Sequence, residues 1–129
     1  MGLFSKSPKP EALPWVEITS TNQLNDLLHN VGEKPVLLFK HSTRCSISSM
    51  ALNGFERNWS TGKELCDIYF IDLLKYRDVS NLAAELTGVP HQSPQVIVIK
   101  DKEIVYVADS NCFKNRTSFS KKWRMSLMP

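Results

Sequence analysis

The sequence has few cysteines, and none of them are close together. Its 129 residues include three cysteines, Cys45, Cys66 and Cys112. An odd number of widely spaced cysteines argues against the disulfide framework of a small secreted protein and favours a reducing setting such as the cytoplasm. There is no C-x-x-C motif and no clustered Cys/His spacing. A bound metal ion is therefore not expected.

Long apolar runs and clustered charge are also missing. No apolar segment approaches the roughly 18 residues that a membrane span requires, and residues 1–10 lack the apolar core of a signal peptide. The formal net charge is only +3, and the basic residues are dispersed except near Lys121, Lys122 and Arg124. These absences give no support to membrane insertion or to nucleic-acid binding.

The composition is that of one globular domain. Hydrophobic residues make up 42% of the chain and charged residues 22%, which is usual for a soluble domain with a substantial core. Residues 1–13 are rich in proline and lysine and are expected to form a flexible N-terminal tail. The single domain would then span residues 14–129.

The most informative stretch covers residues 36–48. Four consecutive apolar residues, from Val36 to Phe39, predict a strand that is buried on both faces, and Ser42 and Thr43 favour a turn and a helix N-cap. The residues that then recur every four positions are Ile47, Ala51, Phe55 and Trp59. This spacing predicts a helix that begins at Cys45.

Cys45 is the candidate nucleophile. At the start of a helix, unpaired backbone N–H groups and the helix dipole favour the thiolate form of a cysteine, and Arg44 could add positive charge. A thiolate is the attacking species in thiol–disulfide exchange, so the stretch points to redox chemistry. The alternative interpretation is that Cys45 is only a small buried residue.

The remaining segments alternate between strand and helix signals. Strands are expected over residues 15–19, 67–72, 95–100 and 103–109, and helices over residues 20–31, 78–88 and 118–125. Helices between the early strands imply parallel crossovers, whereas the two-residue turn Asp101-Lys102 implies a terminal hairpin. The predicted architecture is an α/β, thioredoxin-like fold with a mixed sheet of about five strands and flanking helices.

Polar residues and glycines predict where the helices begin and end. Ser20 and Gln23 have the spacing of a capping box. Asp78 or Ser80 could cap the third helix. The expected helix stops are Gly32 and Gly88.

Three segments of the sequence resemble one protein family. Residues 40–48 (KHSTRCSIS), 79–81 (VSN) and 91–96 (HQSPQV) occur in the order found in the monothiol bacilliredoxin-like proteins of the bacillithiol redox system. These are small thioredoxin-fold proteins that are also described as general stress proteins. The resemblance covers about residues 15–115.

The resemblance implies a role for three residues. Cys45 would be the attacking cysteine, Ser48 would stand where dithiol thioredoxins have their resolving cysteine, and Pro94 would be the cis-proline that faces Cys45. Two positions depart from the family pattern, because Ser46 replaces a frequent proline and Gln92 replaces a frequent glutamate. The first could alter the helix start and the second removes a negative charge near the thiolate.

The expected reaction is transfer of a small thiol from a protein to Cys45. The clients would be S-thiolated proteins, and the co-substrate would be bacillithiol or a similar low-molecular-weight thiol, with no tightly bound cofactor. Positive charge from Lys40, His41, Arg44 and His91 would suit a thiol that bears carboxylates. The residues expected to contact the small thiol are Thr43, Arg44, Ser46, His91, Ser93, Ser110 and Asn111.

Two other functions remain open at this point. The chain could be a non-catalytic thioredoxin-fold stress protein that holds extended peptides in the proline groove, or a dithiol redox partner in which Cys112 is a candidate resolving thiol. Cys112 could instead be incidental, and Ser48 and His91 could be surface residues without a role. Cys66 and Trp15 are expected to be structural.

Overall fold

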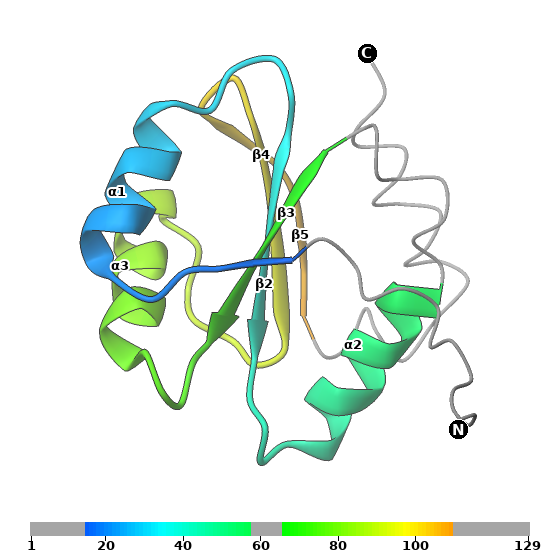
Figure 1. The fold of residues 1–129 in the computed structure, drawn as a ribbon. Coiled ribbons are helices and arrows are strands. Elements are labelled where there is room, and N and C mark those ends of the chain that lie inside the picture. Colours follow the sequence, from blue (N-terminus) through cyan, green and yellow to red (C-terminus); the bar gives the residue numbers. More distant parts are fainter. Residues whose placement is uncertain (1–14, 58–65, 110–129) are drawn as a thin grey trace, which may run out of the picture.

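The protein is built on a five-stranded sheet with strands in both directions (Figure 1). The computed structural model describes residues 15–57 and 66–109. The strands are β1 (Val16–Glu17), β2 (Val36–His41), β3 (Asp67–Asp72), β4 (Gln95–Lys100) and β5 (Glu103–Ala108), in the spatial order β1-β3-β2-β4-β5. β3 is parallel to β1 and β2, whereas β4 is antiparallel to β2 and β5. The predicted mixed sheet is confirmed.

Helices cover both faces of the sheet. α1 (Thr21–His29) and α3 (Arg77–Thr87) lie on one face, and α2 (Ser46–Arg57) lies on the other (Figure 1). No helix within residues 15–57 and 66–109 is both long and apolar enough to cross a membrane. The predicted tail at residues 1–13 and the predicted helix at residues 118–125 lie outside the described residues.

The start of α1 is confirmed, but its end differs from the prediction. Ser20 is the N-cap, and its hydroxyl accepts a hydrogen bond of 3.1 Å from the backbone N–H of Gln23. The helix ends at His29, with Asn30 as C-cap, so the prediction that Gly32 stops it is wrong. Asn30 stops it earlier because its backbone N–H donates to the Leu27 carbonyl and its side-chain amide donates to the Asp26 carbonyl at 2.7 Å.

The start of α3 was not predictable from a capping residue. Tyr76 is the N-cap and makes no side-chain capping bond, so the prediction of Asp78 or Ser80 as the cap is wrong. Both lie inside the first turn, and Ser80 is buried there. Gly88 ends the helix as predicted, with φ of 75°, a left-handed conformation that glycine adopts without steric cost.

The sheet separates two apolar cores. Trp15 closes the core beneath α2, with its ring centroid 5.9 Å from Phe39 and 5.5 Å from Phe55, and its indole N–H donates to Glu56 at 2.9 Å. The predicted packing role of Trp15 is confirmed. The main members of the core beneath α1 and α3 are Leu24, Leu38, Ile71, Val79 and Ile97. All six residues of β2 are buried between these cores.

The hairpin brings the end of β5 back to the beginning of β4. Asp101 and Lys102 form the predicted turn, with φ values of 52° and 67°, and the register places Ala108 opposite Val96. The chain that follows Ala108 therefore leaves the sheet at the edge where Pro94 enters it. Ser110, Asn111 and Cys112 lie outside the described residues, so their predicted contacts stay predictions.

Phe39 offers a test of the core beneath α2. Phe39→Ala should lower the free energy of unfolding by about 3–5 kcal/mol, because the substitution leaves a cavity beside Trp15 and Phe55. Denaturant unfolding followed by tryptophan fluorescence would measure it. Ile104→Ala on the exposed part of β5 is the control and should cost less than about 1 kcal/mol. Equal losses from the two changes would contradict this packing.

Candidate active site

Cys45 lies at the junction between β2 and α2. Its backbone N–H donates to the Ser42 carbonyl at 3.1 Å, and its carbonyl accepts from the Ser49 N–H at 3.1 Å. The first contact closes the turn and the second opens the helix, so Cys45 directly precedes α2. The prediction of a cysteine at a helix start is confirmed. The thiol is free and only half-buried, and it directly precedes the first turn of α2, where backbone N–H groups of a helix lack intrahelical partners.

Ser48 is buried beneath this turn rather than exposed. Its side chain has 0% exposure, so the alternative interpretation as a surface serine is wrong. The hydroxyl accepts a hydrogen bond of 3.1 Å from the Ser42 N–H and lies 2.7 Å from Nδ1 of His41. Among the described residues these two partners, and not the Cys45 sulfur, take its hydrogen bonds. Ser48 therefore connects α2 to the end of β2 and to the turn before Cys45.

His41 completes that connection from the strand side. Its ring is buried on the α2 face, 5.6 Å from the Phe70 ring between centroids. Burial lowers the pKa of His41, and the carboxylates of Asp72 and Glu56 together with the Ser48 hydrogen bond act in the opposite direction. A neutral imidazole carries one N–H, so Nδ1 can either donate to the Ser48 hydroxyl or accept its proton.

Pro94 lies beside this turn, on the β4 side. The Ser93–Pro94 peptide bond is cis, as predicted. Lys40 of β2 pairs with Gln95 of β4, so the next residues outward are His41 and Pro94. The register therefore brings Pro94 to the end of β2 from which the turn to Cys45 departs.

Lys40 does not contribute positive charge to a surface pocket. Its side chain has 0% exposure and extends to the α3 face, so that part of the prediction is wrong. Nζ donates to the Ser80 carbonyl at 3.0 Å and lies 3.4 Å from Nδ1 of His91, which is also 3.3 Å from the Ser80 hydroxyl. Burial lowers the pKa of Lys40 to about 8. Lys40 and Ser80 thus contact the segment that precedes Pro94.

Residues 89–95 contain further polar groups in this region. His91 is exposed at the surface, as one interpretation expected, and its partial desolvation and the charges of Lys40 and Arg77 lower its pKa. The side-chain amide of Gln95 donates to the Pro90 carbonyl at 2.9 Å. Within the described part of the chain, the buried Ser93 hydroxyl and the Gln95 amide oxygen have no hydrogen-bond partner.

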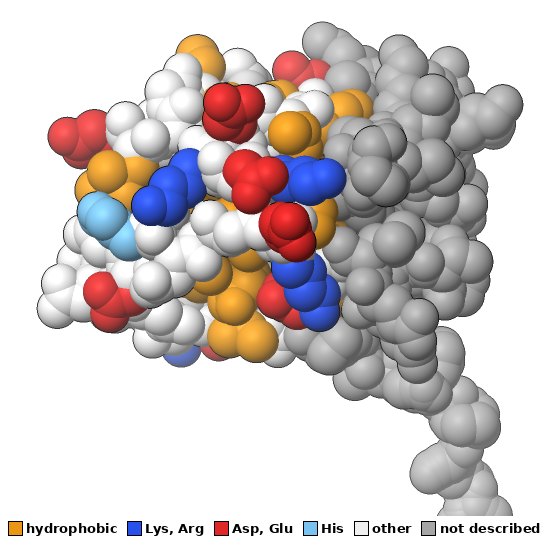
Figure 2. Space-filling view, turned by 90° about the horizontal axis from the view of Figure 1, so that it is seen from above, with side chains coloured by type: hydrophobic (Ala, Val, Ile, Leu, Met, Phe, Trp, Pro, Cys, Tyr) orange, Lys and Arg blue, Asp and Glu red, His pale blue; other side chains and the backbone are white. Residues whose placement is uncertain are grey.

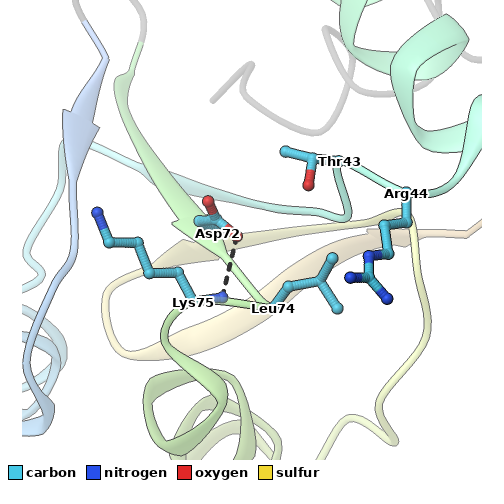
Figure 3. A pocket seen from close by; sticks show the side chains of 5 residues that line it. All are labelled: Thr43, Arg44, Asp72, Leu74 and Lys75. Atoms are coloured by element: carbon cyan, nitrogen blue, oxygen red, sulfur yellow. Dashed lines mark hydrogen bonds between the residues drawn. The ribbon is translucent and has the colours of Figure 1, made fainter.

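A pocket of about 450 Å³ lies on the other side of the turn, between the ends of β2 and β3. Figure 3 shows Arg44 on the α2 side and Lys75 on the opposite side, with Asp72 and Leu74 between them. The Asp72 carboxylate accepts a hydrogen bond of 3.2 Å from the Lys75 backbone N–H. The fifth lining residue is Thr43, which, like Arg44, was predicted to contact a small thiol. The other three were missed because only the fold brings the end of β3 and the residues after it to this turn.

The opposite end of the sheet has a different character. Figure 2 shows basic and acidic side chains interspersed there. Lys34, which precedes β2, and Asp67, which begins β3, form an exposed ion pair of 3.1 Å. Cys66 is also at this end, directly before β3, and is 2% exposed. Burial, together with the nearby Asp67 carboxylate, raises the pKa of Cys66 to about 12, which confirms its predicted structural role.

Solved structures place this arrangement in the thioredoxin class. A protein described provisionally as an oxidoreductase with a thioredoxin fold is 27% identical, with a TM-score of 0.68 over 83% of this chain and 91% of its own. Thioredoxin pre-protein of Schistosoma mansoni is 18% identical, with a TM-score of 0.63 over 84% and 96%. Fasciola hepatica thioredoxin is 13% identical, with a TM-score of 0.61 over 81% and 96%. The last two show similarity of fold alone.

The family is more specific than the fold. The chain belongs to the monothiol bacilliredoxin BrxC family, whose profile matches residues 16–117. This confirms the resemblance found in the sequence. Together, the family and the fold support an oxidoreductase-like role that acts on thiols.

The buried charge of Lys40 predicts a pH-dependent stability. Below pH 8 Lys40 is protonated in both the folded and the unfolded state, and its pKa change from 10.5 to about 8 corresponds to a penalty of about 3 kcal/mol. Between pH 8 and 10.5 the unfolded chain binds more protons, so this contribution makes stability rise with pH. Lys40→Met should therefore be the more stable protein near pH 7, with its advantage shrinking towards pH 10.5.

Denaturant unfolding of both proteins across this pH range would test the prediction. The stabilities must be compared as a difference, because the raised pKa of Cys66 gives a slope of opposite sign above pH 9 in both proteins. Lys100→Met, at the far end of β4, is the matched control. A Lys40→Met difference that stays constant over the range would contradict the assigned charge burial.

Proposed function

We propose that the protein removes a small thiol from S-thiolated client proteins through Cys45. The observation that carries the proposal is a free, half-buried thiol at the start of α2 in a member of the monothiol bacilliredoxin family. The Cys45 thiolate attacks the sulfur of the small thiol in the client disulfide. A Cys45–small-thiol disulfide forms, and the client sulfur leaves as a thiolate that takes up a proton. The step exchanges one disulfide for another, without net oxidation.

We expect the reaction to proceed with one thiol, as the monothiol family suggests. Ser48 stands three residues after Cys45, and its hydroxyl cannot form a disulfide. Cys66 is buried at the other end of the sheet. A second molecule of small thiol, or a thiol of a partner protein, then attacks the Cys45 disulfide, releases the small thiol as a disulfide with the attacking thiol, and regenerates Cys45.

Two surfaces beside Cys45 suit the client. In the thioredoxin fold, the backbone before the proline pairs with an extended client segment, and Ser93 has that position here. Ile47 and Met50 on α2 follow Cys45 closely and are 40% and 59% exposed. They are neighbours at i and i+3 on the helix surface and would give the client an apolar contact next to its disulfide.

The pocket on the β3 side suits the small thiol. Arg44 and Lys75 line it, with Nζ of Lys75 5.5 Å from the centroid of the Tyr76 ring, and its one carboxylate, Asp72, accepts a backbone hydrogen bond. Such a pocket favours a thiol with carboxylates, and the family makes bacillithiol the first candidate. Ser46, Ser110 and Asn111 remain further predicted contacts, whereas His91 lies against Lys40 and Ser80 rather than in this pocket. We place the reaction in the reducing cytoplasm, where a role in redox homeostasis under stress would be useful.

Thiol transfer can be measured directly by intact mass. Reduced protein would be mixed with a model protein capped by bacillithiol or, separately, by glutathione. The mass of one small thiol should move to the wild-type protein and to Cys112→Ser, because Cys45 is the acceptor. Cys45→Ala should accept none.

The other outcomes separate the competing functions. If the adduct collapses to a species two hydrogens lighter than the reduced protein, and only when Cys112 is present, the protein works as a dithiol redox partner. Absence of transfer from either donor, with Cys45 alkylating no faster than a free cysteine, would exclude the enzyme and leave a peptide-binding protein.

Arg44 tests the assignment of the pocket. Arg44→Ala should raise the KM for a donor capped by an acidic small thiol about 3- to 10-fold, since removal of one charge weakens the binding of an anion. It should leave a donor capped by neutral 2-mercaptoethanol within twofold, measured in the same mass assay. Lys34→Ala, at the opposite end of the sheet, is the control for loss of one positive charge. An equal change in KM for both donors would show that Arg44 does not interact with the negative charge of the small thiol.

A further inference from the structure

We propose that Lys40 and His91 are positioning residues that hold residues 89–94 in the conformation that receives the client, an inference that rests on the proposed function. The hold consists of hydrogen bonds between β2, α3 and this segment. It acts on the side of Cys45 that faces Pro94, and it leaves the small-thiol pocket on the β3 side untouched.

The geometry that carries this proposal is a three-element contact. Lys40 comes from β2, Ser80 comes from the first turn of α3, and His91 comes from the segment before Pro94. Nζ of Lys40 donates to the Ser80 carbonyl at 3.0 Å, and Nδ1 of His91 lies 3.4 Å from Nζ and 3.3 Å from the Ser80 hydroxyl. One imidazole nitrogen can accept from both donors only when it carries no proton.

The burial of Lys40 is unusual enough to need a reason. Its side chain has 0% exposure, and charged groups are rarely buried without an ionic partner. Burial alone accounts for the lowered pKa of Lys40, with no contribution from any described carboxylate. A methionine would fill the same space without a charge. Lys40 therefore destabilises the fold relative to an apolar residue. What it adds, and an apolar residue would not, is its hydrogen bonds to α3 and to the His91 segment.

In the described part of the chain, the other hydrogen bonds of residues 89–94 include one of 3.2 Å from the Val89 N–H to the Thr87 hydroxyl. Gln95, the cross-strand partner of Lys40, donates to the Pro90 carbonyl at 2.9 Å. The Ser93 hydroxyl is buried without a partner in the described part of the chain. Loss of the His91 contact would thus leave the Gln95 amide as the main polar link between this segment and the sheet.

Protonation of His91 should release the segment. Among the described residues, Lys40 from β2 and Ser80 from α3 lie next to Nδ1 of its ring, and the positive charge of Arg77 from α3 also acts on it. A proton on Nδ1 removes the acceptor and sets two positive charges against each other. Partial burial and these cations lower the pKa of His91, so the release belongs to acidic conditions, below pH 6.5.

The test must separate the positioning of the client from the reactivity of the thiol. At each pH, the rate of small-thiol transfer from a capped model protein is divided by the rate at which iodoacetamide alkylates Cys45 in the same protein. Dividing by the alkylation rate corrects for the fraction of Cys45 that is in the thiolate form at each pH. Near pH 7 the ratio should fall about tenfold in Lys40→Met, the effect of losing a charged hydrogen bond, and stay within twofold of wild type in Lys100→Met.

The second part of the test is the pH dependence of this ratio. In the wild type the ratio should decline as pH falls below 6.5, whereas His91→Asn, which keeps an acceptor that does not titrate, should show a flat ratio. A flat wild-type ratio, an equal decline in His91→Asn, or an unchanged ratio in Lys40→Met would overturn the proposal. If no protein accepts a small thiol at any pH, the proposed function itself fails, which is a different result.

Discussion

The hydroxyl of Ser48 holds together the turn from which Cys45 acts. It accepts a hydrogen bond from the Ser42 N–H and contacts the His41 ring. One buried side chain therefore connects the end of β2, the turn and the first turn of α2. A cysteine in this place would give the dithiol chemistry of thioredoxins. The serine makes these hydrogen bonds, and its hydroxyl cannot form a disulfide.

The end of β2 serves both sides of the site because strand side chains alternate between faces. His41 extends to the α2 face and reaches Ser48, whereas Lys40 extends to the α3 face and reaches Ser80 and His91. Two consecutive residues thereby contact the cysteine turn and the proline segment. The strand can place both because it is buried along its whole length, which limits the positions available to either side chain.

Much of this arrangement could be predicted from the sequence because local signals agreed with the fold. The apolar run of β2, the helical spacing after Cys45 and the family motif around Pro94 all pointed to the same sheet edge. The start of α3 could not be predicted, because Tyr76 caps it without a polar side chain. The burial of Lys40 and the roles of Asp72, Leu74 and Lys75 depend on which segments the sheet brings together. The only local indication that Lys40 is buried was its position directly after four apolar residues. The same pattern is equally typical of the exposed end of a strand.

Cys45 is expected to be the one reactive thiol of the described structure, and alkylation tests this most directly. In reduced, folded Cys112→Ser protein, peptide mass analysis would follow iodoacetamide labelling of Cys45 and Cys66 near pH 7. We expect Cys45 to react at least about 100-fold faster, because it lies half-exposed at a helix start while Cys66 is buried with a pKa of about 12. Equal rates, or faster labelling of Cys66, would contradict the central claim.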